Sequence, residues 1–598
     1  MKKQLCIFLL LIVTSVGFGQ TTIGYKSVVK YFFESYDYRK DTDTYPVFIK
    51  RNYNYYIAEK SSSSSDVSKE QLFWSAKKGK YIEIDYNEGI FEEKELKDKT
   101  LELNRGGYYD LNPSFGYTNY FIDVIKQLKK KEFISLSDDE IYAIGRAYST
   151  YASSLINHNS GTSSADLCFI KKDHGKNLLT PEQLLTYRHY RHLAISYFYK
   201  LYQKTPSYET FIGNIFTKYS NEHLTSFLDL LLVQNMEEAI KELNDSIYTP
   251  FEIAYAKNTL NSCKQNSILL LSGDNDTYTC LYAQAFLKHR KDVTILNRHL
   301  FGTNNYINHF RDNQTFDAFP LKMELKKSDY SDGTLLNNKL LSRAFVDIET
   351  DSLIIAKNIY ELIKKQGKYY HFPIQFAIET KDKKFIKFTF EEEYIFKNQI
   401  ALYDILISNY PERGIHFQYD GVALKNTKQK HWYGINKTLF TDPSLNSSTS
   451  PFVRAESYQF LTNQLYCPNV NSKTSSINYT IGVYTNAYFQ TASSYYDKNL
   501  LDSCISLMNS FDQKIPDQLK PSIHLINLLL LSGQIDNTTM TKKWTNLYIE
   551  KLNQLIVNKT LPSREKRYRI SSLEALIKLK QPGLNEKLQS TLRALKAY

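Results

Sequence analysis

Apolar and polar residues alternate along the first part of the chain, and this alternation predicts strands. The stretches YPVFIKRNYNYYIAE (residues 45–59) and FWSAKKGKYIEIDY (residues 73–86) switch between apolar and polar residues at a period near two. Successive side chains of a strand point to opposite faces, so this period is typical of half-buried strands. A serine run at residues 61–65 predicts a mobile loop. We therefore expect a strand-rich N-terminal segment at residues 20–115.

From residue 116 the pattern becomes helical. The stretches YFIDVIKQLKKK, DDEIYAIGRAYSTYASSLI and PEQLLTYRHYRHLAISYFYKLYQKTP repeat apolar residues at intervals of three and four. In the last of these, Ala194 and Tyr197 share one face and Pro206 closes a hairpin. This arrangement is typical of a tetratricopeptide-like unit, although no strict 34-residue period runs through the chain. We expect a helical-repeat domain at residues 116–248.

The next region changes to alternating helices and strands. PFEIAYAKNTLNSCKQN predicts a helix, SILLL a buried strand, TYTCLYAQAFLKHR a second helix and VTILN a second buried strand. Such an order is typical of parallel strands joined by a right-handed crossover. Residues 369–379 and 414–421 are further strand candidates. We expect an α/β domain at 249–440, a linker or long loop at 441–475, and a second helical-repeat domain at 476–598. The predicted fold class is mixed α+β.

The N-terminus predicts export. Lys2 and Lys3 precede an apolar run from Leu5 to about Phe18, and small residues follow. This order is typical of a secretory signal peptide, which we place at residues 1–19. The run is too short to span a bilayer, which takes roughly 20 residues, and the later apolar stretches are shorter still. Cys6 lies at the start of the run, so we do not expect a lipoprotein. We expect a periplasmic protein, or one associated with the outer membrane, in a Gram-negative bacterium.

The charge pattern and the cysteine spacing limit the classes of partner and metal that we expect. The net charge is +12, and cleavage of the signal peptide would remove the lysines at positions 2 and 3 and lower it to +10. The lysines are mixed with acids, as in KELKDKTLELNR, so we expect no nucleic-acid partner. The five cysteines that remain lack the CxxC spacing of a structural zinc site. The chain is long for a single core, so several domains or a repeat array are expected.

The sequence GDND, with Asp274, Asn275 and Asp276, joins the first buried strand to the following helix. In open α/β sheets, ligands bind at the carboxyl ends of the strands. Two carboxylates there could hold a hard cation such as Mg²⁺ or Ca²⁺. The competing interpretation is structural, because an Asp before a helix caps free N–H groups and interacts with the helix dipole. We favour the structural interpretation, and whether the turn binds a metal stays open.

Other candidate chemistry is weaker. His189 and His192 are spaced to share one helix face, yet no acidic ligand accompanies them and Arg188 and Arg191 would oppose a cation. The chain contains no HExxH and no GxxxxGK[ST] motif. GTSSA at residues 161–165 lies in a polar loop, which is the wrong context for a nucleophilic serine. We therefore assign no catalytic residue and expect no cofactor.

The stretch SILLLSGDNDTYTCLYAQAFLKHRKDVTILNRHLFGTNNYI resembles the exported region of a bacterial family of unknown function related to the protein O-mannosyltransferases. The matching positions are 273–278, Gln284, Arg290, Asp292, Val293, Asn297, Tyr306 and Ile307. A second block, LYDILISNYPERGIHF, matches at Asp404, Asn409, Arg413, Ile415 and Phe417, and departs at Gly414 and His416. The resemblance spans roughly residues 250–510. It implies an α/β block with helices in a cell-envelope setting. Glycosyl transfer is expected in that family's membrane half, which this sequence does not contain.

Two functions follow as expectations. The first is an exported, non-catalytic cell-envelope protein that acts as a scaffold or binds another envelope protein. The alternative is a metal-dependent carbohydrate-active enzyme or a glycan-binding protein that uses the GDND turn. In that alternative, Asp404 and Arg413 reach the same sheet edge as Asp274 and Asp276; an internal ion pair between Asp404 and Arg413 is the structural interpretation. We further expect Asp274 or Asp276 to cap the helix, and the other acid or Asn275 to connect the turn to a neighbouring segment, for which Asn409–Arg413 is the candidate.

Overall fold

The computed structural model describes residues 21–598 with internal gaps. The gaps are residues 22, 37–43, 62–68, 85–118, 158–162, 171–177, 211, 327–342, 348–353, 367–368, 372, 374, 380–384, 390–393, 419–429, 440–450, 471–474, 522, 560, 562 and 581–582. The predicted signal peptide and most of the predicted serine-rich loop lie outside the described residues. The chain divides into two compact units. The first comprises residues 1–209, 225–239 and 338–341, and the second comprises 210–224, 240–337 and 342–598.

The first unit contains the predicted N-terminal strands. They form an antiparallel sheet in the order β1–β2–β3–β4. The strands are β1 (Thr44–Arg51), β2 (Asn54–Ser61), β3 (Gln71–Ser75) and β4 (Lys80–Tyr81). Helix α2 (Tyr25–Ser35) supplies Val28 and Phe32 to an apolar core that also contains Phe48 and Phe73 of the sheet. The period-two pattern therefore predicted these strands correctly.

The first unit also contains the predicted helices α4 (Tyr120–Leu128), α5 (Asp138–Ile156) and α6 (Pro181–Lys204). Helices α5 and α6 begin at capping boxes, in which the side chains of Ser137 and Thr180 accept hydrogen bonds from the third helical residue. Helix α7 (Ile215–Val233) is divided between the units, with residues 215–224 in the second unit and 225–233 in the first, and α8 (Met236–Ile240) follows. In the first unit, buried Arg191 of α6 forms an ion pair of 2.7 Å with Asp229 of α7. His189 and His192 are both exposed on α6.

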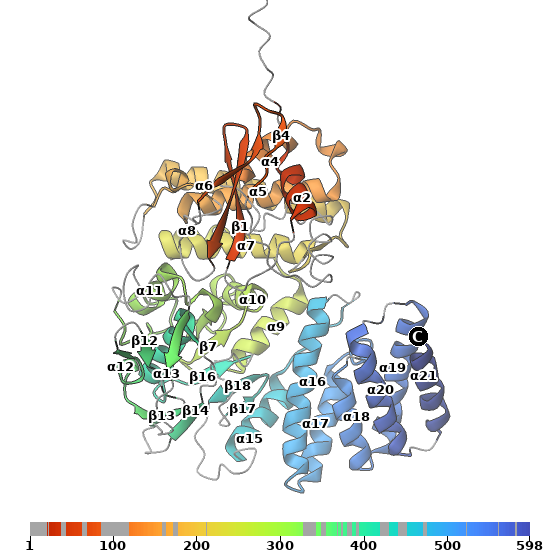
Figure 1. Ribbon diagram of the computed structural model, residues 1–598. Coiled ribbons are helices and arrows are strands. Elements are labelled where there is room, and N and C mark those ends of the chain that lie inside the picture. Colours follow the sequence, from red (N-terminus) through yellow and green to blue (C-terminus); the bar gives the residue numbers. More distant parts are fainter. Residues whose placement is uncertain are drawn as a thin grey trace, which may run out of the picture. The chain divides into compact units, whose positions relative to one another are not determined.

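The second unit is built on the predicted helix–strand–helix–strand block, which the structure confirms. The elements are α9 (Pro250–Asn261), β7 (Ile268–Leu271), α10 (Asp274–Ala285) and β8 (Thr294–Asn297). Strand β16 (Ile415–Phe417) pairs in parallel with β7 on the side opposite to β8. Strands β18 (Asn436–Leu439) and β17 (Lys430–Tyr433) extend the sheet antiparallel, in the order β17–β18–β16–β7–β8. Figure 1 shows this sheet with α9 and α10 nearby.

The prediction of one long strand at residues 369–379 is wrong in detail. Two short strands replace it, and they belong to two different small sheets. One sheet has the order β10–β13–β14 and the other β11–β12–β9–β15. Their strands are β9 (Arg343–Asp347), β10 (Ile354–Ala356), β11 (Lys364–Gln366), β12 (Tyr369–His371), β13 (Gln375–Glu379), β14 (Phe385–Thr389) and β15 (Tyr394–Phe396). Pro373 lies between β12 and β13 and has no backbone N–H for a sheet hydrogen bond. Helices α11 (Asn304–Asp312), α12 (Ile359–Leu362) and α13 (Lys397–Asn409) complete this region.

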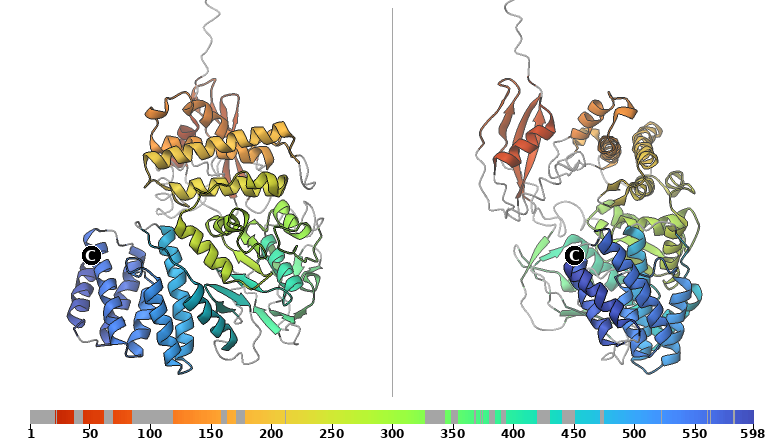
Figure 2. Two further views of the ribbon diagram at one scale, coloured as in Figure 1. Left: turned by 180° about the vertical axis from the view of Figure 1, so that it is seen from behind. Right: turned by 90° about the vertical axis from the view of Figure 1, so that its right-hand side faces the viewer.

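The C-terminal part of the second unit is a row of three helical hairpins. The hairpins are α16 (Ser475–Tyr496) with α17 (Leu501–Lys514), α18 (Leu525–Gln534) with α19 (Thr538–Val557), and α20 (Ser563–Lys578) with α21 (Asn585–Ala597). Helix α18 contacts both α16 and α20, so the hairpins stack side by side (Figure 1 and, from behind, Figure 2). Their apolar core continues into Phe251 and Tyr255 of α9. The hairpins therefore share one core with α9 and with Ile435, which lies between β17 and β18.

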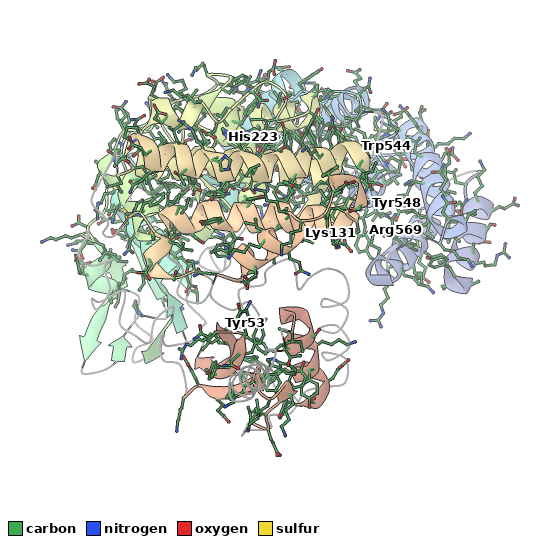
Figure 3. The ribbon with its side chains drawn as sticks, turned by 90° about the horizontal axis from the view of Figure 1, so that it is seen from above. Tyr53, Lys131, His223, Trp544, Tyr548 and Arg569 are labelled. Carbon is green, nitrogen blue, oxygen red and sulfur yellow. The ribbon has the colours of Figure 1, made fainter. Side chains whose placement is uncertain are left out.

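Aromatic side chains fill the space between the hairpins. The Trp544 ring lies 5.4 Å from the Phe511 ring, measured between centroids. The Arg569 guanidinium carbon lies 5.6 Å from the centre of the Tyr548 ring. Figure 3 shows Trp544, Tyr548 and Arg569 among these helices. Contacts between aromatic and cationic groups of this kind stabilise helix packing beyond the burial of apolar area.

Part of the predicted linker is helical. Helix α15 (Pro451–Gln459) and the π-helical turn η6 (Phe460–Gln464) lie within residues 441–475, where we expected a loop. Phe460 and Leu461 are buried in the core of the hairpins, and this burial stabilises the helix despite polar neighbours in the sequence. Across the described part of the chain, none of the helices is both long and apolar enough to cross a membrane.

Candidate functional site

The GDND turn lies at the carboxyl end of β7. Its first residue, Gly273, has φ 100° and ψ 164°, a backbone conformation that L side chains rarely adopt. A Cβ atom at this position would meet no other atom within 4 Å. The conformation therefore requires glycine because of the backbone and not because of crowding. Helix α10 begins directly after it, so Asp274, Asn275 and Asp276 occupy the first helical turn.

Asp274 connects the turn to the next parallel strand. Its Oδ1 accepts a hydrogen bond of 3.1 Å from Nδ2 of Asn297, the last residue of β8. Asn297 is fully buried, and its Oδ1 accepts a hydrogen bond from the His299 backbone N–H. Asp274 keeps some exposed surface, yet burial by surrounding atoms raises the pKa of its carboxyl, while Lys218 and the Asn297 hydrogen bond oppose the rise.

Asn275 connects the turn to a different segment of the second unit. Nδ2 of Asn221, in α7, donates a hydrogen bond of 2.7 Å to Asn275 Oδ1. Nδ2 of Asn275 donates one of 3.0 Å to the backbone carbonyl of Ile212. Both the oxygen and the nitrogen of the Asn275 side-chain amide therefore form hydrogen bonds. Asn275 acts as a structural connection, as the sequence predicts for one residue of the turn.

Asp276 faces α9. The Tyr255 hydroxyl donates a hydrogen bond of 3.2 Å to Asp276 Oδ1. The same hydroxyl accepts one of 2.8 Å from Nε2 of Gln418, the residue directly after β16. Burial raises the pKa of Asp276 to about 6, and the Tyr255 hydrogen bond opposes the rise. A chain of side chains therefore joins the carboxyl ends of β7 and β16.

The expected helix cap is absent. Gly273 occupies the N-cap position, and no side chain caps α10. Because the helix begins at Asp274 itself, the two acids lie inside the first turn and project toward other elements. Their negative charge still interacts favourably with the helix dipole. The prediction that an acid caps the helix is wrong, and the prediction that the turn connects neighbouring segments is confirmed.

Asp404, Asn409 and Arg413 belong to a different place. Asp404 in α13 accepts hydrogen bonds from the backbone N–H groups of Glu324 and Leu325. The Asn409 side chain bonds to the backbone N–H and carbonyl of Lys322. Both side chains fix the segment before residue 327 against α13, so neither one contacts the GDND turn.

Arg413 lies at the amino end of the sheet. Its guanidinium donates to the backbone carbonyls of Asn266, Ser267 and Phe319 and to the hydroxyl of Thr294. Residues 266 and 267 precede β7, whereas the GDND turn follows it, and the four-residue strand itself is about 13 Å long. The four-residue site of Asp274, Asp276, Asp404 and Arg413 therefore does not form. The prediction of an ion pair between Asp404 and Arg413 is also wrong, because Asp404 accepts hydrogen bonds from backbone N–H groups and Arg413 donates to backbone carbonyls.

The carboxyl edge is the place where the sheet changes direction. The chain runs from β7 through α10 to β8 on one side of β7, and later returns to β16 on the other side. In open α/β sheets, ligands bind at the carboxyl ends of the strands where the strand order reverses. Asp276, Tyr255 and Gln418 meet between β7 and β16. The sequence identified Asp276 and did not identify Tyr255 or Gln418 as members of the site.

Other residues shared with the resembling family have structural roles. The Arg290 guanidinium pairs with Asp292 and donates to the backbone carbonyls of Leu260, Cys263 and Lys264. Gln284 donates to the carbonyls of Arg290 and Val293. These bonds fix the loops around the sheet. Within the described residues, no three His, Cys, Asp or Glu side chains are placed to hold a metal ion.

The chain resembles a known family over part of its length. A family model described as TMEM260-associated domain 2 matches residues 252–381. That family is linked to TMEM260, a protein O-mannosyltransferase. The matched range contains the GDND turn and Asn297 and leaves out Asp404, Asn409, Arg413 and Gln418. No curated protein and no solved structure matches the chain.

Proposed function

We propose that the protein is an exported, non-catalytic cell-envelope protein whose C-terminal hairpins bind another envelope protein. The observation that supports this most is the stack of three hairpins that shares a core with helix α9 of the α/β block. Stacked hairpins expose an extended surface to which each repeat contributes, and such surfaces suit protein partners. A common core holds that surface in a fixed position on the α/β block.

Two exposed tyrosines offer contact area on this surface. Tyr479 of α16 is 48% exposed and Tyr568 of α20 is 42% exposed. Both lie near the starts of their helices, and His524 directly precedes α18. The His524 ring approaches Gly482 of α16; burial lowers the pKa of His524, and nearby Glu565 of α20 opposes this. Large aromatic side chains at this exposure are common anchors in protein interfaces.

The proposal is tested by affinity capture from solubilised envelope with the full mature chain. The test variant carries Tyr479→Ser and Tyr568→Ser together. The matched control carries Val557→Ser, which removes an apolar side chain that is 77% exposed at the end of α19. We expect one envelope protein to be retained by the wild type and by the control, and to be lost with the double variant. Equal retention by all three chains, or retention of nothing, contradicts the proposal.

A further inference from the structure

The two acids of the GDND turn have different electrostatic surroundings. Asp274 faces a cation: burial raises the pKa of its carboxyl, and the positive charge of Lys218 of α7 opposes this rise. Asp276 faces Tyr255, and no ion pair joins it to a Lys, Arg or His among the described residues. A buried carboxylate without a counter-ion is unfavourable. The Asp276 side of the turn therefore has an unbalanced negative charge when the carboxyl is ionised.

The same side has a surplus of hydrogen-bond acceptors. Gln418 Nε2 donates to Tyr255 and Thr259, while its Oε1 is buried and accepts no hydrogen bond from a described residue. Asn436 is fully buried; its Nδ2 donates to the Thr259 carbonyl, and its Oδ1 likewise has no donor among the described residues. Buried acceptors of this kind nearly always have a donor in native proteins.

These two amides lie side by side. Phe417 of β16 pairs with Lys437 of β18 in antiparallel register, so Gln418 and Asn436 are the next pair. Cross-strand neighbours have Cβ atoms about 5 Å apart. Both side chains reach the same residue of α9, Thr259. The Tyr255 hydroxyl forms hydrogen bonds with both Asp276 Oδ1 and Gln418 Nε2, so these two atoms lie within roughly 6 Å of each other.

An aromatic wall borders this group. The Tyr255 and Tyr484 rings have centroids 6.2 Å apart and planes inclined at 56°. Tyr484 is itself fixed by a hydrogen bond of 2.8 Å from Asn258 Nδ2. The faces of aromatic rings attract cations, most strongly where water is excluded. A carboxylate, unpaired carbonyl oxygens and aromatic rings thus meet at the switch point of the sheet.

We propose that the carboxyl edge between β7 and β16 binds a primary ammonium group, with Asp276 as its counter-ion and Gln418 Oε1 as a hydrogen-bond acceptor. An ammonium group has three donors and one positive charge, which match these partners. Anions are repelled by Asp276. A divalent cation prefers several carboxylates, and this side of the turn presents one.

The test uses n-butylammonium chloride as the probe and n-butanol at equal concentration as a neutral control of the same size. Binding to the full mature chain is measured by calorimetry at pH 7.5 and by the midpoint of thermal unfolding. We expect n-butylammonium to bind and to raise the midpoint, and butanol to have no effect. A peptide with one central lysine and blocked ends is the second arm. Binding of the peptide at least tenfold tighter than n-butylammonium identifies a protein lysine as the source of the group.

Two variants separate this site from the rest of the turn. Asp276→Asn removes the charge and keeps the shape, and it mimics the protonated carboxyl, so it is expected to fold and to bind no n-butylammonium. Asp274→Asn, two residues earlier, removes a charge that faces Lys218 and is expected to leave binding unchanged. Equal loss in both variants, or binding that survives Asp276→Asn, overturns the proposal.

A pH series tests the site without substitution. Asp276 is faced by Tyr255 from α9 and by Cys280 from the next turn of α10, and burial raises the pKa of both, so they stay neutral between pH 5 and 8. Gln418 does not titrate. The affinity of the wild type is therefore expected to fall about tenfold from pH 7.5 to pH 5 as Asp276 becomes protonated. If the affinity is independent of pH, or if n-butylammonium and butanol bind equally, the proposal is wrong and Asp276 and Gln418 Oε1 accept hydrogen bonds only from water.

Discussion

The amino end of the central sheet is closed by paired polar groups, whereas its carboxyl end carries polar groups without partners among the described residues. At the amino end, the Arg413 and Arg290 guanidinium groups donate to six backbone carbonyls (Asn266, Ser267, Phe319, Leu260, Cys263 and Lys264). At the carboxyl end, Asp276 has one hydrogen bond, and Gln418 Oε1 has none. Both ends are assembled from the same three parallel strands, so the difference lies in the side chains and not in the backbone.

This difference separates stability from binding within one sheet. A buried charge stabilises a fold only when hydrogen bonds and opposite charges compensate its desolvation. At the amino end, backbone carbonyls accept hydrogen bonds from both guanidinium groups and Asp292 pairs with Arg290, although burial lowers the pKa of Arg413 to about 10. At the carboxyl end, Asp274 has the Asn297 hydrogen bond and a nearby Lys218, whereas Asp276 has the Tyr255 hydroxyl as its hydrogen-bond partner and burial raises its pKa to about 6. Groups with perturbed pKa values in a crevice are typical of binding sites.

The largest effect is expected at the amino end. Arg413→Met removes the donor from three backbone carbonyls and from Thr294, which stay buried. We expect the free energy of unfolding to fall by about 3–5 kcal/mol, since each unsatisfied buried group costs about 1–3 kcal/mol. Urea unfolding at pH 7.5 measures it. The matched control is Arg298→Met at the carboxyl end, where Nε bonds to the Ser272 hydroxyl. An equal loss in the control would remove the contrast between the two ends.

The strands and the turn could be predicted from the sequence, and the composition of the site could not. The short and mainly apolar runs SILLL and VTILN identified β7 and β8, because strands buried on both faces are mostly apolar. Asn297 is the last residue of β8, and its position at the end of an apolar run already indicates the sheet edge. Tyr255 and Gln418 carry no such signal. They meet Asp276 only because α9 packs beside α10 and β16 pairs with β7 from a distant part of the chain.

Arg413 shows a second limit of sequence reasoning. Asp404 is the acid that we expected as the ion-pair partner of Arg413, and the structure pairs Arg413 with backbone carbonyls instead. Every residue has a carbonyl, so residue types give no indication of such a partner. The capping prediction failed for a related reason. Gly273 takes the N-cap position, and the backbone conformation that places it there is not visible in the order of residue types.

The second-largest effect is expected for a substitution of Asp276, which should raise the free energy of unfolding, whereas Arg413→Met should lower it. The folded pKa of about 6 is higher than that of an unfolded aspartate, so the folded chain binds the proton more tightly. The resulting stability is fully present below about pH 4 and is lost as the pH rises through 6. We therefore expect Asp276→Asn to raise the free energy of unfolding by about 1–2 kcal/mol at pH 8 and to leave it unchanged at pH 4. Chemical unfolding of both chains across this range measures it, and destabilisation at pH 8 would show that the ionised carboxyl is compensated.

The smallest effect is expected at Asp274. Asp274→Ala removes one hydrogen bond to Asn297 and one favourable interaction with the helix dipole, so we expect a loss of about 0.5–1 kcal/mol. A double-mutant cycle with Asn297→Ala isolates the pair, and the coupling should not exceed about 1 kcal/mol. Added Mg²⁺, Ca²⁺ or chelator should not change the unfolding midpoint of the wild type, because Asn297 and the positive charge of Lys218 already satisfy Asp274. If Ca²⁺ raises the unfolding midpoint of the wild type and no longer raises that of Asp274→Ala, the turn is instead a metal site.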